Sequence, residues 1–195
     1  DFIPESKIIE YSIKNKSTLT NRTVNNFIDE ISRDSFAPGG GSVSALSGSL
    51  GAALTAMVSN LTVSNKKYVD YKSFHKKSSI ISQKYKKQLI QCIDDDTIAY
   101  NAIISARRLQ KKTKEQEVFR DKQILKATIQ ATDIPFKILQ ISCDAITEAH
   151  EVSSRGNKNS ISDIGVASIM LHAAAKGAFY NILIRRFFLV SSFKT

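Results

Sequence analysis

The chain is poor in residues that interrupt helices and in residues that form cross-links. Its 195 residues include three prolines, eight glycines and two cysteines. Cys92 and Cys143 lie far apart in apolar-periodic segments, so we expect buried free thiols rather than a disulfide framework. The N-terminus lacks the apolar core of a signal peptide, which favours a cytoplasmic location.

Several kinds of functional site lack their sequence signatures. His75, His150 and His172 are scattered without metal-ligand spacing, and no Ser-His-Asp or Cys-His arrangement can be argued. The glycines at 39–41 are neither preceded by a strand nor followed by the Lys-Ser/Thr pair of a nucleotide P-loop. We therefore expect no metal and no tightly bound cofactor.

Acidic residues are few relative to basic ones. The 28 lysines and arginines exceed the 18 acidic residues, and many lie within 66–87 and 107–126. Two interpretations remain open: a solvated helix surface, or attraction of a polyanionic ligand. No zinc-finger spacing, aromatic RNA-binding motif or recognition helix accompanies the charge, so nucleic acid is not the expected partner.

One stretch carries no charge and holds five of the eight glycines. It is FAPGGGSVSALSGSLGAALTAMVSNLTVS at 36–64. Its many serines and threonines argue against a membrane span, although its length would suffice for one. Small residues recur every fourth position at Ser44, Gly48, Ala52 and Ala56, which predicts a central, buried helix from Ser42 to about Ser64.

The apolar residues elsewhere recur at three and four positions, and no segment alternates as a strand would. This pattern predicts an all-α, antiparallel up-and-down bundle of about five or six helices. The other expected helices span Val24 to near Ser35, capped by Thr20 or Thr23; Asp70 to Leu109, as one helix or two collinear ones; Thr113 to the loop at 154–160, broken or kinked at Pro135; and Ser162 onward.

Two features are candidates for chemistry. Asp96 interrupts an otherwise apolar seam, so it is either a proton-transfer group or a carboxylate that hydrogen-bonds Tyr, Ser or a helix end. Asp94 lies about 160° away round the helix and does not pair with it. The turn at Gly39, Gly40, Gly41 and Ser42 either presents backbone N–H groups to a ligand or only lets two helices meet closely.

The chain resembles the cyclodeaminase/cyclohydrolase family in four segments. These are the glycine-rich stretch, IDDDTIAYN at 93–101, SDIGVA at 162–167 and KGAFYNILI at 176–184. The resemblance covers about residues 20–184 and implies an all-helical, at least dimeric enzyme of one-carbon metabolism acting on a folate, possibly polyglutamylated. It implies that Asp96 donates a proton and that the Gly39–Ser42 turn holds the substrate. Further substrate-binding positions implied by the resemblance are Lys66, Lys67, Asn157, Asp163 and Asn181.

The opening residues FIPESKIIEY resemble the connector that follows the formiminotransferase domain in the fused bifunctional enzyme. We therefore expect residues 1–17 to be a connector from an upstream domain and 18–195 to be the helical domain. The connector favours a formimidoyltetrahydrofolate cyclodeaminase of histidine degradation over a methenyltetrahydrofolate cyclohydrolase. One departure concerns Arg185, where the family usually has Asn, and the chain after it resembles nothing in the family. An inactive folate-binding domain therefore also remains open.

Overall fold

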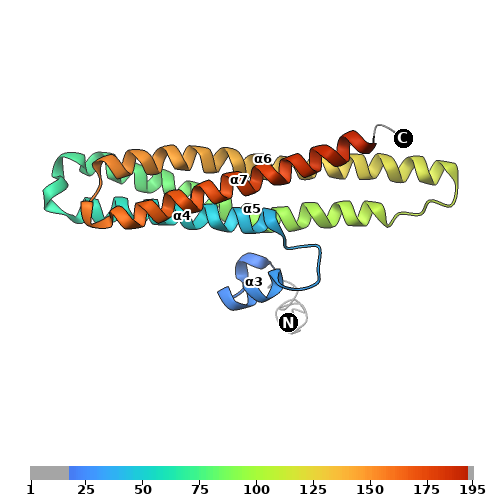
Figure 1. The fold of residues 1–195 in the computed structure, drawn as a ribbon, viewed down its shortest axis with the longest axis horizontal. Helices are drawn as coiled ribbons and strands as arrows, with labels where there is room; N and C mark the ends of the chain where they lie inside the picture. The colour runs from blue at the N-terminus through green and yellow to red at the C-terminus, as the bar shows by residue number, and fades with distance from the viewer. Residues whose placement is uncertain (1–17, 193–195) are drawn as a thin grey trace, which may run out of the picture.

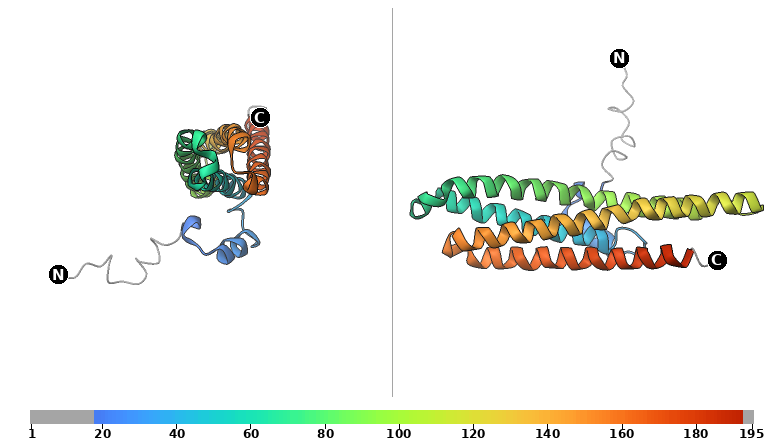
Figure 2. Two further views of the ribbon diagram at one scale, coloured as in Figure 1. Left: turned by 90° about the vertical axis from the view of Figure 1, so that its left-hand side faces the viewer. Right: turned by 90° about the horizontal axis from the view of Figure 1, so that it is seen from above.

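Four long helices run alternately up and down one axis, and in the end-on view of Figure 2 they occupy the corners of a square. The computed structural model describes residues 18–192, with side chains to residue 185. The long helices are α4 (Gly40–Ser64), α5 (Lys72–Arg107), α6 (Lys114–Arg155) and α7 (Ile161–Ser192), as Figure 1 shows. The short α3 (Val24–Ile31) lies outside the bundle. The described residues contain no strand, so the predicted all-α bundle is confirmed.

Three short 3-10 helices complete the described chain. They span Leu19–Asn21, Lys66–Tyr71 and Lys158–Ser160. The first precedes α3, the second joins α4 to α5, and the third joins α6 to α7. The predicted connector at 1–17 lies outside the described residues.

Side-chain caps set two of the helix starts that the sequence predicts. Thr23 accepts a hydrogen bond from the backbone of Asn26 at the start of α3, and Thr113 does the same for Gln116 at the start of α6. The predicted start of α4 at Ser42 was wrong, because this helix begins at Gly40 with Gly39 at the cap position, whereas its predicted end at Ser64 is confirmed. No described glycine has a positive φ, so close packing rather than an unusual backbone angle accounts for glycine here.

Pro135 does not interrupt its helix. The sequence predicted a break or kink at this residue, but α6 is assigned as one continuous helix of 42 residues. A proline inside a helix removes one backbone hydrogen bond, at a cost of about 3 kcal/mol. Pro135 is fully buried and lies next to core residues such as Ile138, so tertiary packing offsets that cost.

Small residues bring α4 into direct contact with its neighbours. A Cβ added at Gly51 would lie 2.7 Å from Leu171 Cγ and 2.8 Å from the carbonyl oxygen of Ala167, both on α7. One added at Gly177 would lie 2.2 Å from Ser44 Oγ. The predicted small faces of α4 are therefore confirmed as sites of close helix packing.

The start of α4 lies part-way along the bundle, whereas the other three helices continue past it (Figure 1). Gly41 in the first turn of α4 faces Asp96, and α5 extends eleven residues beyond Asp96 to Arg107. The bundle consequently changes from four helices to three beside Asp96. The N-terminus of α4 points toward this three-helix extension.

The two cysteines lie in different environments. Cys92 is fully buried in the core, and burial raises its pKa to about 11. Cys143 is exposed on α6, so the prediction of a second buried thiol was wrong.

Gly40–Ser64 and Lys158–Arg185 are long and apolar enough to cross a membrane by length and composition alone. The other helices bury 61% of the most apolar window in the first segment, as expected for a core helix.

Candidate functional site

Asp96 lies inside the bundle where α5 faces the first turn of α4. The residue is only 6% exposed, and its predicted seam neighbours Leu89, Ile93 and Ile103 are also buried. A Cβ added at Gly41 would lie 2.3 Å from Asp96 Oδ2, so only glycine lets the carboxylate approach the helix this closely. The positive end of the α4 dipole then faces a negative charge, which is a favourable arrangement.

Ser42 fastens α4 to α5 with its side chain. It is fully buried, and its hydroxyl lies 3.0 Å from the carbonyl oxygen of Ile93 and 3.5 Å from Asp96 Oδ2. Thr97 Oγ1 is 3.3 Å away on the same helix as Asp96. The Ser42 side chain thus positions Asp96, while Gly39 and Gly40 keep exposed backbone surface. The first-turn N–H groups of an α-helix have no partner within it.

A buried ion pair joins Asp96 to Arg185 of α7. Arg185 Nη2 donates a hydrogen bond of 2.8 Å to Asp96 Oδ1, and Arg185 is only 8% exposed. Its Nη1 atom is buried without a hydrogen-bond partner. The sequence marked Arg185 as a departure from the family but not as a site residue. Its spacing of four from Asn181 and eight from Gly177 places it on the helix face that turns toward α4.

Asn181 lies one turn before Arg185 and beside the same end of α4. Its Nδ2 donates 2.8 Å to the carbonyl oxygen of Gly177, and a Cβ added at Gly40 would lie 3.5 Å from that Nδ2. A cavity of about 150 Å³ begins here and is walled by α5, α6 and α7 alone. Its lining residues are Tyr100, Ile103, Arg107, Thr128, Asn181, Ile184 and Arg185.

The remaining predicted binding residues lie at the opposite end of α4. Lys66 and Lys67 follow α4 directly and are exposed, and Asn65 accepts a hydrogen bond of 3.0 Å from the Lys67 backbone. The backbone N–H of Asn157 donates 2.9 Å to Thr62 Oγ1. Asp163, in the first turn of α7, is half-buried near them.

These four residues lie more than about 25 Å from Asp96 along the bundle, since Asp163 precedes Asn181 by 18 residues of α7 at 1.5 Å per residue and the other three lie near or past the end of α4. A single chain therefore joins Asp96, Gly39–Ser42 and Asn181 in one site. It does not bring Lys66, Lys67, Asn157 or Asp163 to that site.

The two other aspartates of the IDDDT segment point elsewhere, as the helical angles predicted. Asp94 accepts hydrogen bonds from the backbone of Leu19 at 2.7 Å and from Thr20 Oγ1 at 2.6 Å, which holds the N-terminal segment against α5. Asp95 accepts one of 2.9 Å from Gln91, a helical turn away. Neither carboxylate shares the environment of Asp96, and the described residues contain no cluster suited to a metal ion.

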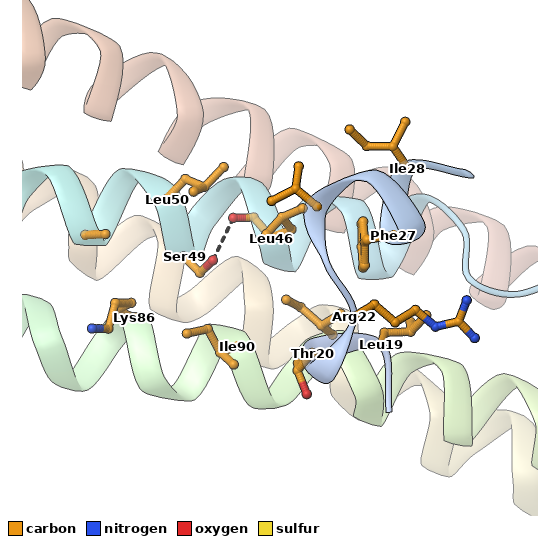
Figure 3. A pocket seen from close by; sticks show the side chains of 13 residues that line it. Leu19, Thr20, Arg22, Phe27, Ile28, Leu46, Ser49, Leu50, Lys86 and Ile90 are labelled. Carbon is orange, nitrogen blue, oxygen red and sulfur yellow. Dashed lines mark hydrogen bonds between the residues drawn. The ribbon is translucent and has the colours of Figure 1, made fainter. Parts of the chain in front are cut away.

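A larger, apolar cavity of about 480 Å³ lies under α3, between α4 and α5. Figure 3 shows Phe27 and Ile28 of α3 at one end of this cavity and Leu46 and Leu50 along α4, while the Ser49 hydroxyl donates a hydrogen bond to the Leu46 carbonyl oxygen. None of the predicted site residues lines this cavity. The smaller cavity beside Asp96, where charged and polar groups converge, is the better candidate for a reaction site.

Comparisons with known proteins place the chain among folate enzymes of one family. The sequence model described as "Formiminotransferase-cyclodeaminase" matches residues 23–185. The chain is 36% identical to a methenyltetrahydrofolate cyclohydrolase of Methylorubrum extorquens, over 84% of this chain and 79% of that protein. It is 30% identical to the rat formimidoyltransferase-cyclodeaminase over 94% of this chain, which spans only 34% of the rat protein.

The fold has a solved counterpart as well. The structure of a formiminotetrahydrofolate cyclodeaminase from Thermotoga maritima superposes with a TM-score of 0.75, at 21% identity, over 89% of this chain and 87% of that one. At this identity the likeness concerns the fold alone. Because the family model covers most of the described helices, the chain belongs to the formiminotransferase-cyclodeaminase family.

Proposed function

We propose that this domain is a formimidoyltetrahydrofolate cyclodeaminase, which converts 5-formiminotetrahydrofolate to 5,10-methenyltetrahydrofolate and releases ammonia. The observation that carries the proposal is the buried Asp96 carboxylate, held against the first turn of α4 and paired with Arg185, which lines the neighbouring cavity. Family membership supplies the folate substrate class, and the geometry supplies a group able to move a proton in a site screened from water.

The reaction needs one proton to move from N10 to the formimino nitrogen, two atoms that are bonded to the same carbon in the tetrahedral intermediate. N10 attacks the carbon of the protonated formimino group (C=NH2+), the C=N π electrons move to its nitrogen, and a tetrahedral centre with a neutral amino group forms. The Asp96 carboxylate takes the N10 proton and delivers it to the amino group, whose C–N bond then breaks to release ammonia. The N5 lone pair completes the methenyl bridge, so the carboxylate returns to its starting state.

The groups around Asp96 bind the substrate and position the carboxylate. The exposed backbone of Gly39 and Gly40, at the start of α4, offers N–H donors to the pterin or its amide. Ser42 and Arg185 hold the Asp96 carboxylate from two sides. We assign Asn181 to substrate contact at the cavity mouth. Within one chain, Lys66, Lys67, Asn157 and Asp163 lie too far from Asp96 to contact the same folate.

Asp96→Asn tests the proton-transfer assignment. The amide keeps the size of the carboxylate but cannot accept the N10 proton, so we expect turnover of 5-formiminotetrahydrofolate to fall about 100-fold or more. Ammonia release and the methenyl absorbance measure it, with circular dichroism to verify folding. Full activity in the variant would show that Asp96 has no such role.

A methenyltetrahydrofolate cyclohydrolase is the second candidate. The 36% identity to the Methylorubrum enzyme, which the chain matches over 79% of its length, favours it. That reaction exchanges water instead of ammonia at the same carbon. Supplying the purified domain with each substrate in turn decides between the two, because only the cyclodeaminase forms methenyl product from the formimino substrate with release of ammonia.

The Arg185–Asp96 ion pair favours a third candidate, an inactive folate-binding domain. The guanidinium occupies one oxygen of the carboxylate that the reaction requires. If wild-type protein binds a folate yet converts neither substrate, this third candidate is correct and both enzymatic proposals fail.

Further proposals concern the setting of the domain. We place it in the cytoplasm, in histidine degradation and one-carbon metabolism, as a homo-oligomer without a resident cofactor. We also propose a fused formiminotransferase domain upstream, because the bifunctional rat relative matches over 94% of this chain. The full coding sequence upstream of Asp1 tests the fusion directly.

A further inference from the structure

The cavity next to the Arg185–Asp96 ion pair is lined by basic, hydroxyl and apolar side chains. Its walls carry two guanidinium groups, from Arg107 and Arg185, and none of its lining residues is acidic. Tyr100 and Thr128 add hydroxyl groups, and Ile103 and Ile184 supply apolar surface. Such a wall suits a ligand portion that combines an apolar body with a negative end.

Arg185 provides an unused donor in this wall. One guanidinium nitrogen is satisfied by Asp96 at 2.8 Å, while Nη1 is buried with no partner. A buried donor without an acceptor is costly, because folding removes its water without replacing it. A carboxylate in the cavity would accept from Nη1 and would form a charge-assisted hydrogen bond.

The position of the cavity relative to Asp96 determines which part of a ligand reaches it. All lining residues belong to the three-helix extension, and none belongs to α4. On α5 they follow Asp96 at four, seven and eleven residues, along one face over about three turns. A folate whose reacting carbon lies at Asp96 and whose tail points along the three-helix extension therefore places the part beyond N10 at this cavity.

We propose that this cavity is a carboxylate-binding subsite, in which Arg185 Nη1 binds the carboxylate of the aminobenzoylglutamate part of the folate. The proposal rests on the proposed function, since it takes the substrate class from there. Arg185 then has two partners, one carboxylate from the chain and one from the ligand. Its positive charge orients the substrate tail and Asp96 with respect to each other.

The test measures binding of the pterin-free fragment N-(4-aminobenzoyl)-L-glutamate and of its diamide, by titration calorimetry at fixed ionic strength. Wild-type protein is expected to bind the diacid about tenfold or more tightly than the diamide. Arg185→Gln should abolish that preference. Lys176→Gln removes the same charge from an exposed position on α7 and should keep it.

The double variant Asp96→Asn with Arg185→Gln removes both members of the ion pair. It therefore avoids an unpaired buried carboxylate if the single variant folds poorly. The subsite is disproved if wild type shows no preference for the diacid, or if the preference survives in Arg185→Gln or in the double variant.

Measuring the turnover of the formimino substrate distinguishes failure of the proposed subsite from failure of the proposed reaction. Turnover without a diacid preference overturns the subsite and leaves the reaction in place. A diacid preference without turnover supports the subsite and overturns the reaction.

Discussion

Gly41 and Asp96 form the most tightly constrained pair in the candidate site. Asp96 approaches the first turn of α4 only because position 41 has no side chain. The sequence predicted Asp96 from its place on an apolar seam, since a charge at a buried helical position is visible in the spacing. It did not predict the partner Arg185, because an ion pair between residues 89 positions apart depends on how α5 and α7 pack.

Gly41→Ala should reduce activity strongly. The added methyl group would lie 2.3–2.5 Å from the Asp96 carboxylate, so that side chain has to move from its position between Ser42 and Arg185. We expect a loss of at least about tenfold in kcat/KM, since small displacements of a reacting group are costly. Gly165→Ala is the matched control, because no atom lies within 4 Å of its added Cβ. Equal activity in the two variants would contradict the close contact.

The two cysteines should differ sharply in reactivity. The thiolate is the reactive form, and burial raises the Cys92 pKa to about 11, so at pH 8 Cys92 remains a buried thiol. Native protein should therefore react rapidly with a thiol reagent at the exposed Cys143 alone, and denatured protein at both. Cys143→Ser should abolish the fast reaction in the native state. A fast reaction that persists in this variant would mean that Cys92 is accessible.

At the scale of elements, the sequence predicted helix existence better than helix boundaries. The long helices follow from the spacing of apolar residues and from scarce glycine and proline. The start of α4 was misplaced because serine is a common N-cap, while the structure uses Ser42 as a buried link to Ile93. The predicted break at Pro135 did not occur, because packing of the buried face of α6 outweighed the local preference.

Gly51→Ala tests whether close packing of α4 on α7 stabilises the bundle. Alanine favours a helix over glycine by about 1 kcal/mol, but the new Cβ would lie 2.7 Å from Leu171 Cγ and 2.8 Å from the Ala167 carbonyl oxygen. The backbone oxygen cannot move away alone, so we expect a net loss of about 1–3 kcal/mol in the free energy of unfolding. Urea denaturation measures it. Gly165→Ala should instead gain about 0.5–1 kcal/mol, because its site is open.

At the scale of the whole molecule, the predicted site residues separate into two groups at opposite ends of α4. The family resemblance named both groups, but sequence motifs carry no information about distance along a bundle. Asp96, Asn181 and the Gly39–Ser42 turn meet where α4 begins, and the Lys66, Lys67, Asn157 and Asp163 group lies where it ends. The net charge of +10 favours approach of an acidic ligand to either end.

The exposed side of α4 gives the last prediction, on assembly. Val43, Leu50 and Met57 recur every seven residues, each is at least 37% exposed, and α4 carries no charged side chain. Exposed apolar residues at every seventh position of one uncharged helix favour packing against a second copy. We expect light scattering to give at least twice the chain mass of 21.6 kDa. Met57→Glu should lower that mass by placing a charge in the contact, whereas Ile80→Glu, on α5 and 71% exposed, should leave it unchanged. A wild-type mass of one chain would show that this face of α4 stays in contact with solvent.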